Sequence, residues 1–148
     1  MSFSKDRSAG YLANHMARIF AQGLTARIKP LGLTTGTFPA LLELWETDGL
    51  TQKQLIERLD IEQATMANTL ARMERDGLIV RKKDANDGRA QRVWLTDRAR
   101  ALRDPAIAAA EEENAMRLGA LTEDERNQFL ALMQKVIETK APGKRGET

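Results

Sequence analysis

A cluster of basic residues between Ile79 and Leu95 is the most chemically distinctive part of the sequence. Five cations and two aspartates give this segment a net charge of +3, whereas the whole chain carries only +2. The cations are Arg81, Lys82, Lys83, Arg89 and Arg92. Cations at this density can follow the phosphates of a nucleic acid, and a thin basic loop can enter a narrow, negative minor groove.

The segment also has the residue types of a β-hairpin. Residues 78–80 (LIV) and 92–95 (RVWL) predict two strands, and residues 84–88 (DANDG) predict the turn. Asp87 lies two residues before Arg89, where it can hold the loop or the guanidinium in place. We therefore predict that Arg89 probes a minor groove, with Arg81, Lys82 and Lys83 along the flanking phosphates; the alternative is an ordinary solvated hairpin charge.

A helix predicted over residues 63–75 has one apolar and one polar face. Met66, Leu70 and Met73 recur at helical spacing and should face the core. Thr65, Asn68, Arg72 and Arg75 fall on the opposite side. A helix fits the major groove of B-DNA, where base edges carry distinguishable hydrogen-bonding patterns. The sequence therefore predicts a DNA-reading helix directly before the basic hairpin.

The residue types on this helix suggest separate roles in binding. Gln63 and Asn68 can pair with adenine, and Ala64 can touch a thymine methyl group. Arg72 and Arg75 are better placed for phosphates, which position a protein without specifying sequence. Thr65 can contact DNA or simply bond to local backbone. The full set of predicted DNA-contacting residues is Gln63, Ala64, Thr65, Ala67, Asn68, Arg72, Arg75, Arg81, Lys83, Asp87 and Arg89.

The elements around this helix and hairpin predict a winged helix-turn-helix fold, mainly α-helical with a small β-hairpin wing. A capping box of Thr51 and Gln54 starts the helix before the DNA-reading helix, and Gly77 ends the latter. Thr96 should cap a fifth helix, which Pro105 should kink, and Thr122 with Glu125 should start a sixth. The expected helices are 6–29, 38–46, 51–59, 63–75, 96–118 and 122–139, followed by a frayed tail over 140–148.

The first and last helices carry wide apolar stripes. A small lobe over residues 34–96 cannot cover them, so we predict that segments 5–30 and 97–139 form a dimerisation region of one 148-residue domain. The alternative is that the two helices pack only on each other. The residues predicted at the dimer interface are Ile19, Phe129, Leu130, Met133, Val136 and Ile137.

Residues 50–96 resemble the DNA-binding core of the MarR family of bacterial transcription regulators. The resemblance is carried by MERDGLIVR at 73–81, DANDGR at 84–89 and WLT at 94–96, and LGLT at 31–34 also suits the family. It implies a homodimer on a pseudo-palindromic operator, usually a repressor that releases DNA on binding a small phenolic or anionic ligand. Asn68 departs from the longer, often basic residue of many relatives, and peroxide sensing through cysteine is excluded because the chain has none.

Four residues are candidates for lining a ligand pocket, namely Tyr11, His15, Phe38 and Trp45. For the aromatic residues the alternative is ordinary core packing, and for His15 it is a hydrogen bond to nearby backbone. A lone histidine without cysteine is a poor metal site, so we predict no metal and no cofactor.

Other functions find less support in the sequence. Without cysteine there is no disulfide or thiolate zinc site, and no catalytic constellation can be assembled, so we predict a protein that is not an enzyme. No long apolar run or signal peptide is present, which predicts a cytoplasmic protein. Glu111–Glu113 should be a solvated helix face. The rival function is a winged-helix module that docks on an acidic protein partner.

Overall fold

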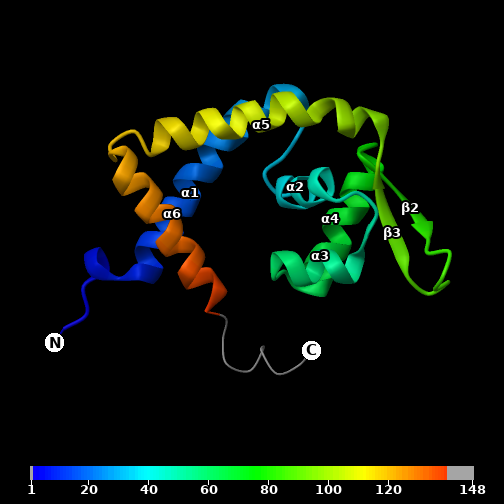
Figure 1. The fold of residues 1–148 in the computed structure, drawn as a ribbon, viewed down its shortest axis with the longest axis horizontal. Coiled ribbons are helices and arrows are strands. Elements are labelled where there is room, and N and C mark those ends of the chain that lie inside the picture. The colour runs from blue at the N-terminus through cyan, green and yellow to red at the C-terminus, as the bar shows by residue number, and fades with distance from the viewer. Residues whose placement is uncertain (1, 140–148) are drawn as a thin grey trace. The chain divides into compact units, whose positions relative to one another are not determined.

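A computed structural model describes residues 2–139 as a chain of helices interrupted by a small antiparallel sheet (Figure 1). The predicted fold class, mainly α with a β-hairpin, is therefore confirmed. In chain order the elements are η1 (Lys5–Arg7), α1 (Ala9–Ile28), η2 (Lys29–Leu31), α2 (Phe38–Glu46), β1 (Leu50–Thr51), α3 (Gln52–Leu59), α4 (Gln63–Arg75), β2 (Ile79–Lys83), β3 (Gln91–Leu95), α5 (Asp97–Arg117) and α6 (Glu123–Glu138).

Local capping signals set most helix ends. The Thr51 hydroxyl accepts from the Gln54 N–H at 3.1 Å while the Gln54 side chain accepts from the Thr51 N–H at 2.9 Å. Thr122 and Glu125 form the same reciprocal pair at the start of α6. At the end of α4, Gly77 adopts a left-handed conformation (φ 74°) and lets the Leu78 N–H reach the Met73 carbonyl. These predictions are confirmed.

The first helix begins later than predicted. The sequence predicted a start at Asp6, but α1 starts at Ala9 because the Ser8 hydroxyl accepts from the Tyr11 N–H at 3.3 Å. Residues 5–7 form a separate 3-10 turn. At the other end α1 stops at Ile28, and the chain continues as a second 3-10 turn that contains Pro30. The proline prediction is thus confirmed to within one turn.

The sheet has three strands in the order β1-β3-β2, one more than the predicted hairpin. Leu50 pairs with Val93 on the far side of β3 from β2. In the hairpin, Ile79 faces Leu95 and Lys83 faces Gln91, so β2 runs through all three adjacent cations. The predicted strands were therefore too short, and basic residues occupy the arm itself.

The hydrophobic core joins α2, α3 and α4 to the sheet and the start of α5. Leu41, Leu55 and Leu70 are fully buried, one from each helix, and Val93 of β3 and Ala99 of α5 are buried with them. Met66 and Met73 complete the inward face of α4 as predicted. The outer face of α4 is thereby held in a fixed orientation by its own core contacts.

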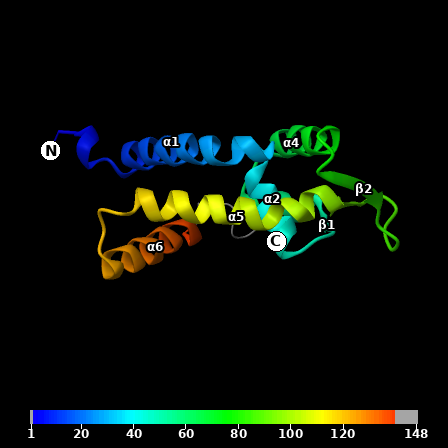
Figure 2. The same cartoon turned by 90° about the horizontal axis from the view of Figure 1, so that it is seen from above.

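The C-terminal half of α1 lies beside α5 (Figure 2). Arg27 donates to Glu112 at 2.9 Å, and its Nε lies 3.7 Å from Glu113. Glu113 is only 2% exposed, so the prediction that Glu111–Glu113 form a solvated face is wrong for this residue. The reason is Gly23, whose missing side chain leaves room for the carboxylate, while Arg27 supplies the opposite charge.

The chain divides into two compact units, Met1–Glu113 and Asn114–Thr148. In the described part of the second unit, α6 buries none of its residues and exposes apolar ones, including Leu130, Leu132, Val136 and Ile137. Helix α5 continues through Pro105, and the kink there stays a prediction. The predicted tail, 140–148, lies outside the described residues. Within residues 2–139, none of the helices is both long and apolar enough to cross a membrane.

Candidate nucleic-acid interface

The outer face of α4 is polar and open to solvent. Gln63, Ala64, Thr65, Asn68, Arg72 and Arg75 are all exposed, whereas Ala67 is half-buried at the edge of the face. The Arg72 guanidinium extends toward the loop before α2, where its Nη1 would lie 3.8 Å from a Cβ placed on Gly36. Arg75 lies near Asp76, with Nε and Oδ1 3.9 Å apart. The predicted surface thus exists as a continuous hydrogen-bonding face.

The turn before α4 fixes how this face is presented. Helix α3 ends at Asp60, which takes a left-handed conformation (φ 52°) that aspartate tolerates better than most residues. Ile61, next in the chain, packs against the core. The chain therefore reverses within a few residues, and α4 starts at Gln63 without a side-chain cap on its first turn. Its leading N–H groups point toward whatever approaches this end.

The hairpin tip is ordered by two aspartates. Asp87 Oδ1 accepts from the Arg89 N–H at 3.0 Å, and the Asp87 carbonyl accepts from the Ala90 N–H at 3.1 Å. Asp84 Oδ1 accepts from the Asn86 N–H at 3.1 Å. The inference that Asp87 orders this loop is confirmed for the backbone. Arg89 is exposed at this ordered tip.

Arg92 is a structural cation of the hairpin. Its Nη2 lies 3.2 Å from Asp84 Oδ2, and its Nη1 donates to the Gly49 carbonyl at 2.8 Å. The hydrogen bond from the Asn86 N–H, together with Arg92, holds the pKa of Asp84 below its ordinary value, although partial burial opposes the shift. The predicted net charge of the segment therefore overstates the charge that faces outward. Only the strand register, with Thr51 opposite Arg92, reveals this role.

Arg81 also has a partner inside the protein. Its side chain is 21% exposed, and its Nε lies 3.8 Å from Glu74 Oε2 on α4. Nε itself is buried without a hydrogen bond. Arg81 thus links the wing to the DNA-reading helix, a role that the sequence analysis missed. Lys83, two residues further on, is exposed on the arm.

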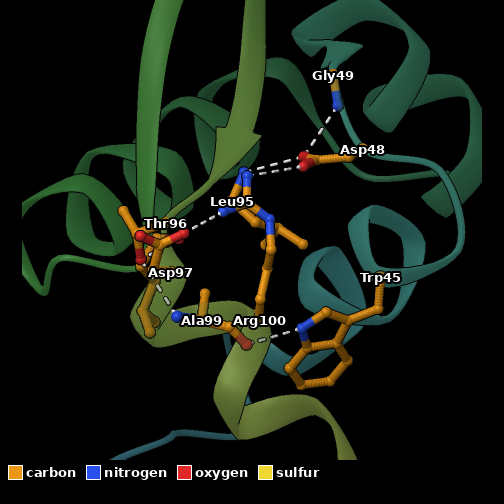
Figure 3. A network of polar contacts seen from close by, with 9 residues as sticks. Trp45, Asp48, Gly49, Leu95, Thr96, Asp97, Ala99 and Arg100 are labelled. Atoms are coloured by element: carbon orange, nitrogen blue, oxygen red, sulfur yellow. Dashed lines mark hydrogen bonds and ion pairs between the residues drawn. The ribbon is translucent and has the colours of Figure 1, made fainter.

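A polar network at the root of the wing was also missed (Figure 3). Asp48 Oδ1 accepts from the N–H groups of Gly49 and Leu95 at 3.0 and 2.9 Å, and Oδ2 lies 3.5 Å from Arg100 Nη2. The Trp45 indole donates to the Ala99 carbonyl at 3.0 Å. Together these contacts join α2, β3 and α5, so the wing is anchored at its base as well as ordered at its tip.

The four candidate pocket residues form two separate pairs. Phe38 and Trp45 meet edge to face at 6.0 Å on α2, where Phe38 belongs to the core. Tyr11 and His15 meet edge to face at 6.3 Å on the exposed side of α1. A single chain does not bring the four together, and a shared pocket stays a prediction. Among residues 2–139 there is no cluster of three or more potential metal ligands.

Comparison with known proteins places this arrangement in a family. The model described as MarR family matches residues 31–90, which span α2 to the wing tip. The transcriptional regulator HosA of Escherichia coli is 33% identical over 129 residues, covering 86% of this chain and 96% of HosA. The chain belongs to the MarR family. The predicted family membership is thereby confirmed.

Two further MarR-type relatives extend the match over most of the chain. The transcriptional repressor Rv2887 of Mycobacterium tuberculosis is 28% identical over 136 residues, covering 92% of this chain and 98% of Rv2887. A MarR family regulator from Listeria monocytogenes, solved with a 26mer DNA, superposes with a TM-score of 0.82 at 26% identity, covering 89% of this chain and 88% of that one. The similarity thus includes the flanking helices as well as the winged core.

Proposed function

We propose that this MarR family protein regulates transcription by binding double-stranded DNA as a homodimer. Helix α4 enters the major groove, and the wing places Arg89 in the neighbouring minor groove. The proposal is carried by one observation: a solvent-facing polar helix surface lies directly before a hairpin whose tip is ordered around an exposed arginine. The Listeria relative solved with DNA and the repressor Rv2887 support DNA binding and repression.

The composition of the outer α4 face favours DNA over a protein partner. Its exposed residues hydrogen bond, carry charge or are small, and no aromatic residue or leucine of α4 is exposed. Protein interfaces are centred on aromatic and apolar anchors surrounded by polar residues. An acidic protein that docked here would find cations but no apolar anchor on this helix. The rival docking function therefore has the weaker support.

A second copy of the chain is the proposed cover for the apolar surface of α6. Val136 and Ile137 are 73% and 67% exposed, and they continue the predicted stripe of Leu130 and Met133. Burying such surface is favourable by about 25 cal/mol per Å² of apolar area. Two-fold symmetry also gives each dimer two α4 helices, which matches an inverted repeat in the operator.

Response to a small phenolic or anionic effector is the part of the proposal that rests on family membership. Tyr11 and His15 are candidate contacts because both rings are exposed and adjacent on α1. Salicylate is a suitable probe, since it is both phenolic and anionic. If it acts as an effector, it should raise the thermal midpoint of the free protein and release it from DNA.

Selection from a random duplex library tests the central proposal, because it assumes no particular operator sequence. The full-length protein should enrich an inverted repeat, and its affinity for that duplex should fall steeply as salt rises. Sedimentation should show two chains bound to one duplex. Failure to enrich any sequence, with binding equal for all duplexes, would remove the assignment of α4 as a reading helix.

A further inference from the structure

The C-terminal end of α4 is fastened to the start of α5. The Thr96 hydroxyl donates to the Gly77 carbonyl at 2.7 Å, and the Thr96 N–H donates to the Leu78 carbonyl at 3.0 Å. The same hydroxyl accepts from the Ala99 N–H at 3.2 Å and so caps α5. The segment that ends the DNA-reading helix and the first turn of α5 therefore share one hydrogen-bonded junction.

Arg98 adds a charged contact to this junction and extends it toward α1. Its Nη1 donates to the Asp76 carbonyl, the C-cap residue of α4. A Cβ placed on Gly77 would lie 3.8 Å from Nη1, and one placed on Gly32 would lie 3.3 Å from Nη2. Gly32 ends the 3-10 turn that follows α1. One guanidinium thus lies between the ends of two helical segments, where carbonyl groups favour a cation.

We propose that Arg98 is a positioning residue for DNA recognition, because it fixes the C-terminal end of α4 against α1 and α5. This inference rests on the proposed function of α4. Helix α4 has 13 residues and is therefore about 20 Å long, so a tilt of about 10° at its C-terminal end would move its leading tip by about 3 Å. Such a movement would break base contacts by Gln63 and Asn68, which need defined geometry.

Phosphate contacts respond differently to the same tilt. Long lysine and arginine side chains can follow a displaced phosphate, and these contacts carry no sequence information. Loss of Arg98 should therefore reduce discrimination between operator and unrelated DNA more than it reduces overall binding. A purely structural role would lower stability, and a direct phosphate contact would weaken binding to every duplex alike. Discrimination is thus the quantity that identifies a positioning role.

The test compares Arg98→Ala and Arg98→Lys with wild type on two duplexes, the one selected by the wild-type protein and a scrambled duplex of equal composition. Fluorescence anisotropy should show that Arg98→Ala lowers operator affinity about tenfold, the equivalent of one charge-assisted hydrogen bond, while scrambled-duplex affinity changes less than about twofold. Arg98→Lys keeps the charge but loses the planar fork, so its operator affinity should fall to an intermediate value.

Arg103→Ala is the matched control. Arg103 lies on the same helix, is exposed, and pairs with neighbouring Asp104 at 2.8 Å, away from the α4 junction. This variant should retain the wild-type ratio of operator to scrambled affinity, with a thermal midpoint close to that of Arg98→Ala. Equal losses on both duplexes, or unchanged discrimination in both Arg98 variants, would overturn the positioning role. If wild type itself selects no operator, the proposed function has failed instead.

Discussion

Gly23 on α1 and Glu113 on α5 fit together as an empty side-chain position and the carboxylate that fills it. A Cβ on Gly23 would overlap the Glu113 carboxylate, which is nearly fully buried beside Arg27. Gly23→Ala should therefore force the two helices apart or displace the carboxylate. We expect a loss of about 1–3 kcal/mol in the free energy of unfolding, measured by thermal or urea denaturation.

Gly10→Ala supplies the control within the same helix. Nothing lies within 4 Å of a Cβ placed on Gly10, so alanine there adds helix propensity without a clash. This variant should be neutral or more stable by up to about 1 kcal/mol. If Gly23→Ala were equally harmless, the close packing of α1 against Glu113 would be refuted.

Arg89→Ala tests the wing. The Arg89 side chain is exposed at the hairpin tip, and the Asp87 carboxylate holds its backbone N–H rather than depending on the guanidinium. The variant should fold normally and keep its thermal midpoint. Operator affinity, measured by anisotropy, should fall about tenfold or more because the minor-groove cation is lost.

Arg103→Ala removes the same charge from α5 and should leave operator affinity within about twofold, since an exposed cation away from the duplex contributes only screened attraction. Full affinity in Arg89→Ala would show that the wing does not enter a groove. Equal weakening by both substitutions would point to bulk charge instead of a local contact.

The pH response of the wing depends on Asp84. Its folded pKa lies below the ordinary value of 3.8, first through the Asn86 N–H and then through Arg92. The ionised carboxylate therefore contributes stability above that value, and the contribution is lost as pH falls through the folded pKa. Carboxyl NMR titration should give a midpoint below 3.8, followed by loss of the ordered signals of Asn86 and Ala90.

Asp84→Asn separates the two partners. An amide oxygen can still accept from the Asn86 N–H, but it cannot form an ion pair with Arg92. The variant should keep the turn and lose this acid-dependent step. A wild-type midpoint at or above the ordinary value would mean that the observed contacts do not stabilise the charged form.

Elements governed by neighbours in the sequence were predictable. Helices α2 and α4 have the predicted ends because Pro39 and Gly77 mark them locally, and both capping boxes are recognised from residues three positions apart. The buried face of α4 follows from its 3.6-residue period. The polar outer face, which carries most of the candidate site, follows from the same period.

Contacts between distant residues were not predictable. Strand β1 has only two residues, and its pairing with β3 depends on Leu50 meeting Val93 across 43 positions. Asp48 resembled an ordinary turn residue, yet its carboxylate accepts from Leu95. Arg92 resembled an outward cation, yet its partners are Asp84 and the Gly49 carbonyl. In each case residue type allowed several environments, and tertiary packing selected one.

The apolar stripe of α6 leads to a prediction about assembly. If a second chain covers Val136 and Ile137, Val136→Glu/Ile137→Glu would bury unpaired carboxylates in the interface, which is costly. We expect the dimer dissociation constant, measured by sedimentation equilibrium, to rise about a hundredfold or more. Ala131→Glu is the matched control, because at 100° per residue Ala131 lies on the opposite side of the helix from Val136 and Ile137. Its dimer should be as stable as wild type. A double variant that remains fully dimeric would show that α6 does not form the interface, and inverted-repeat binding would then need a different two-fold contact.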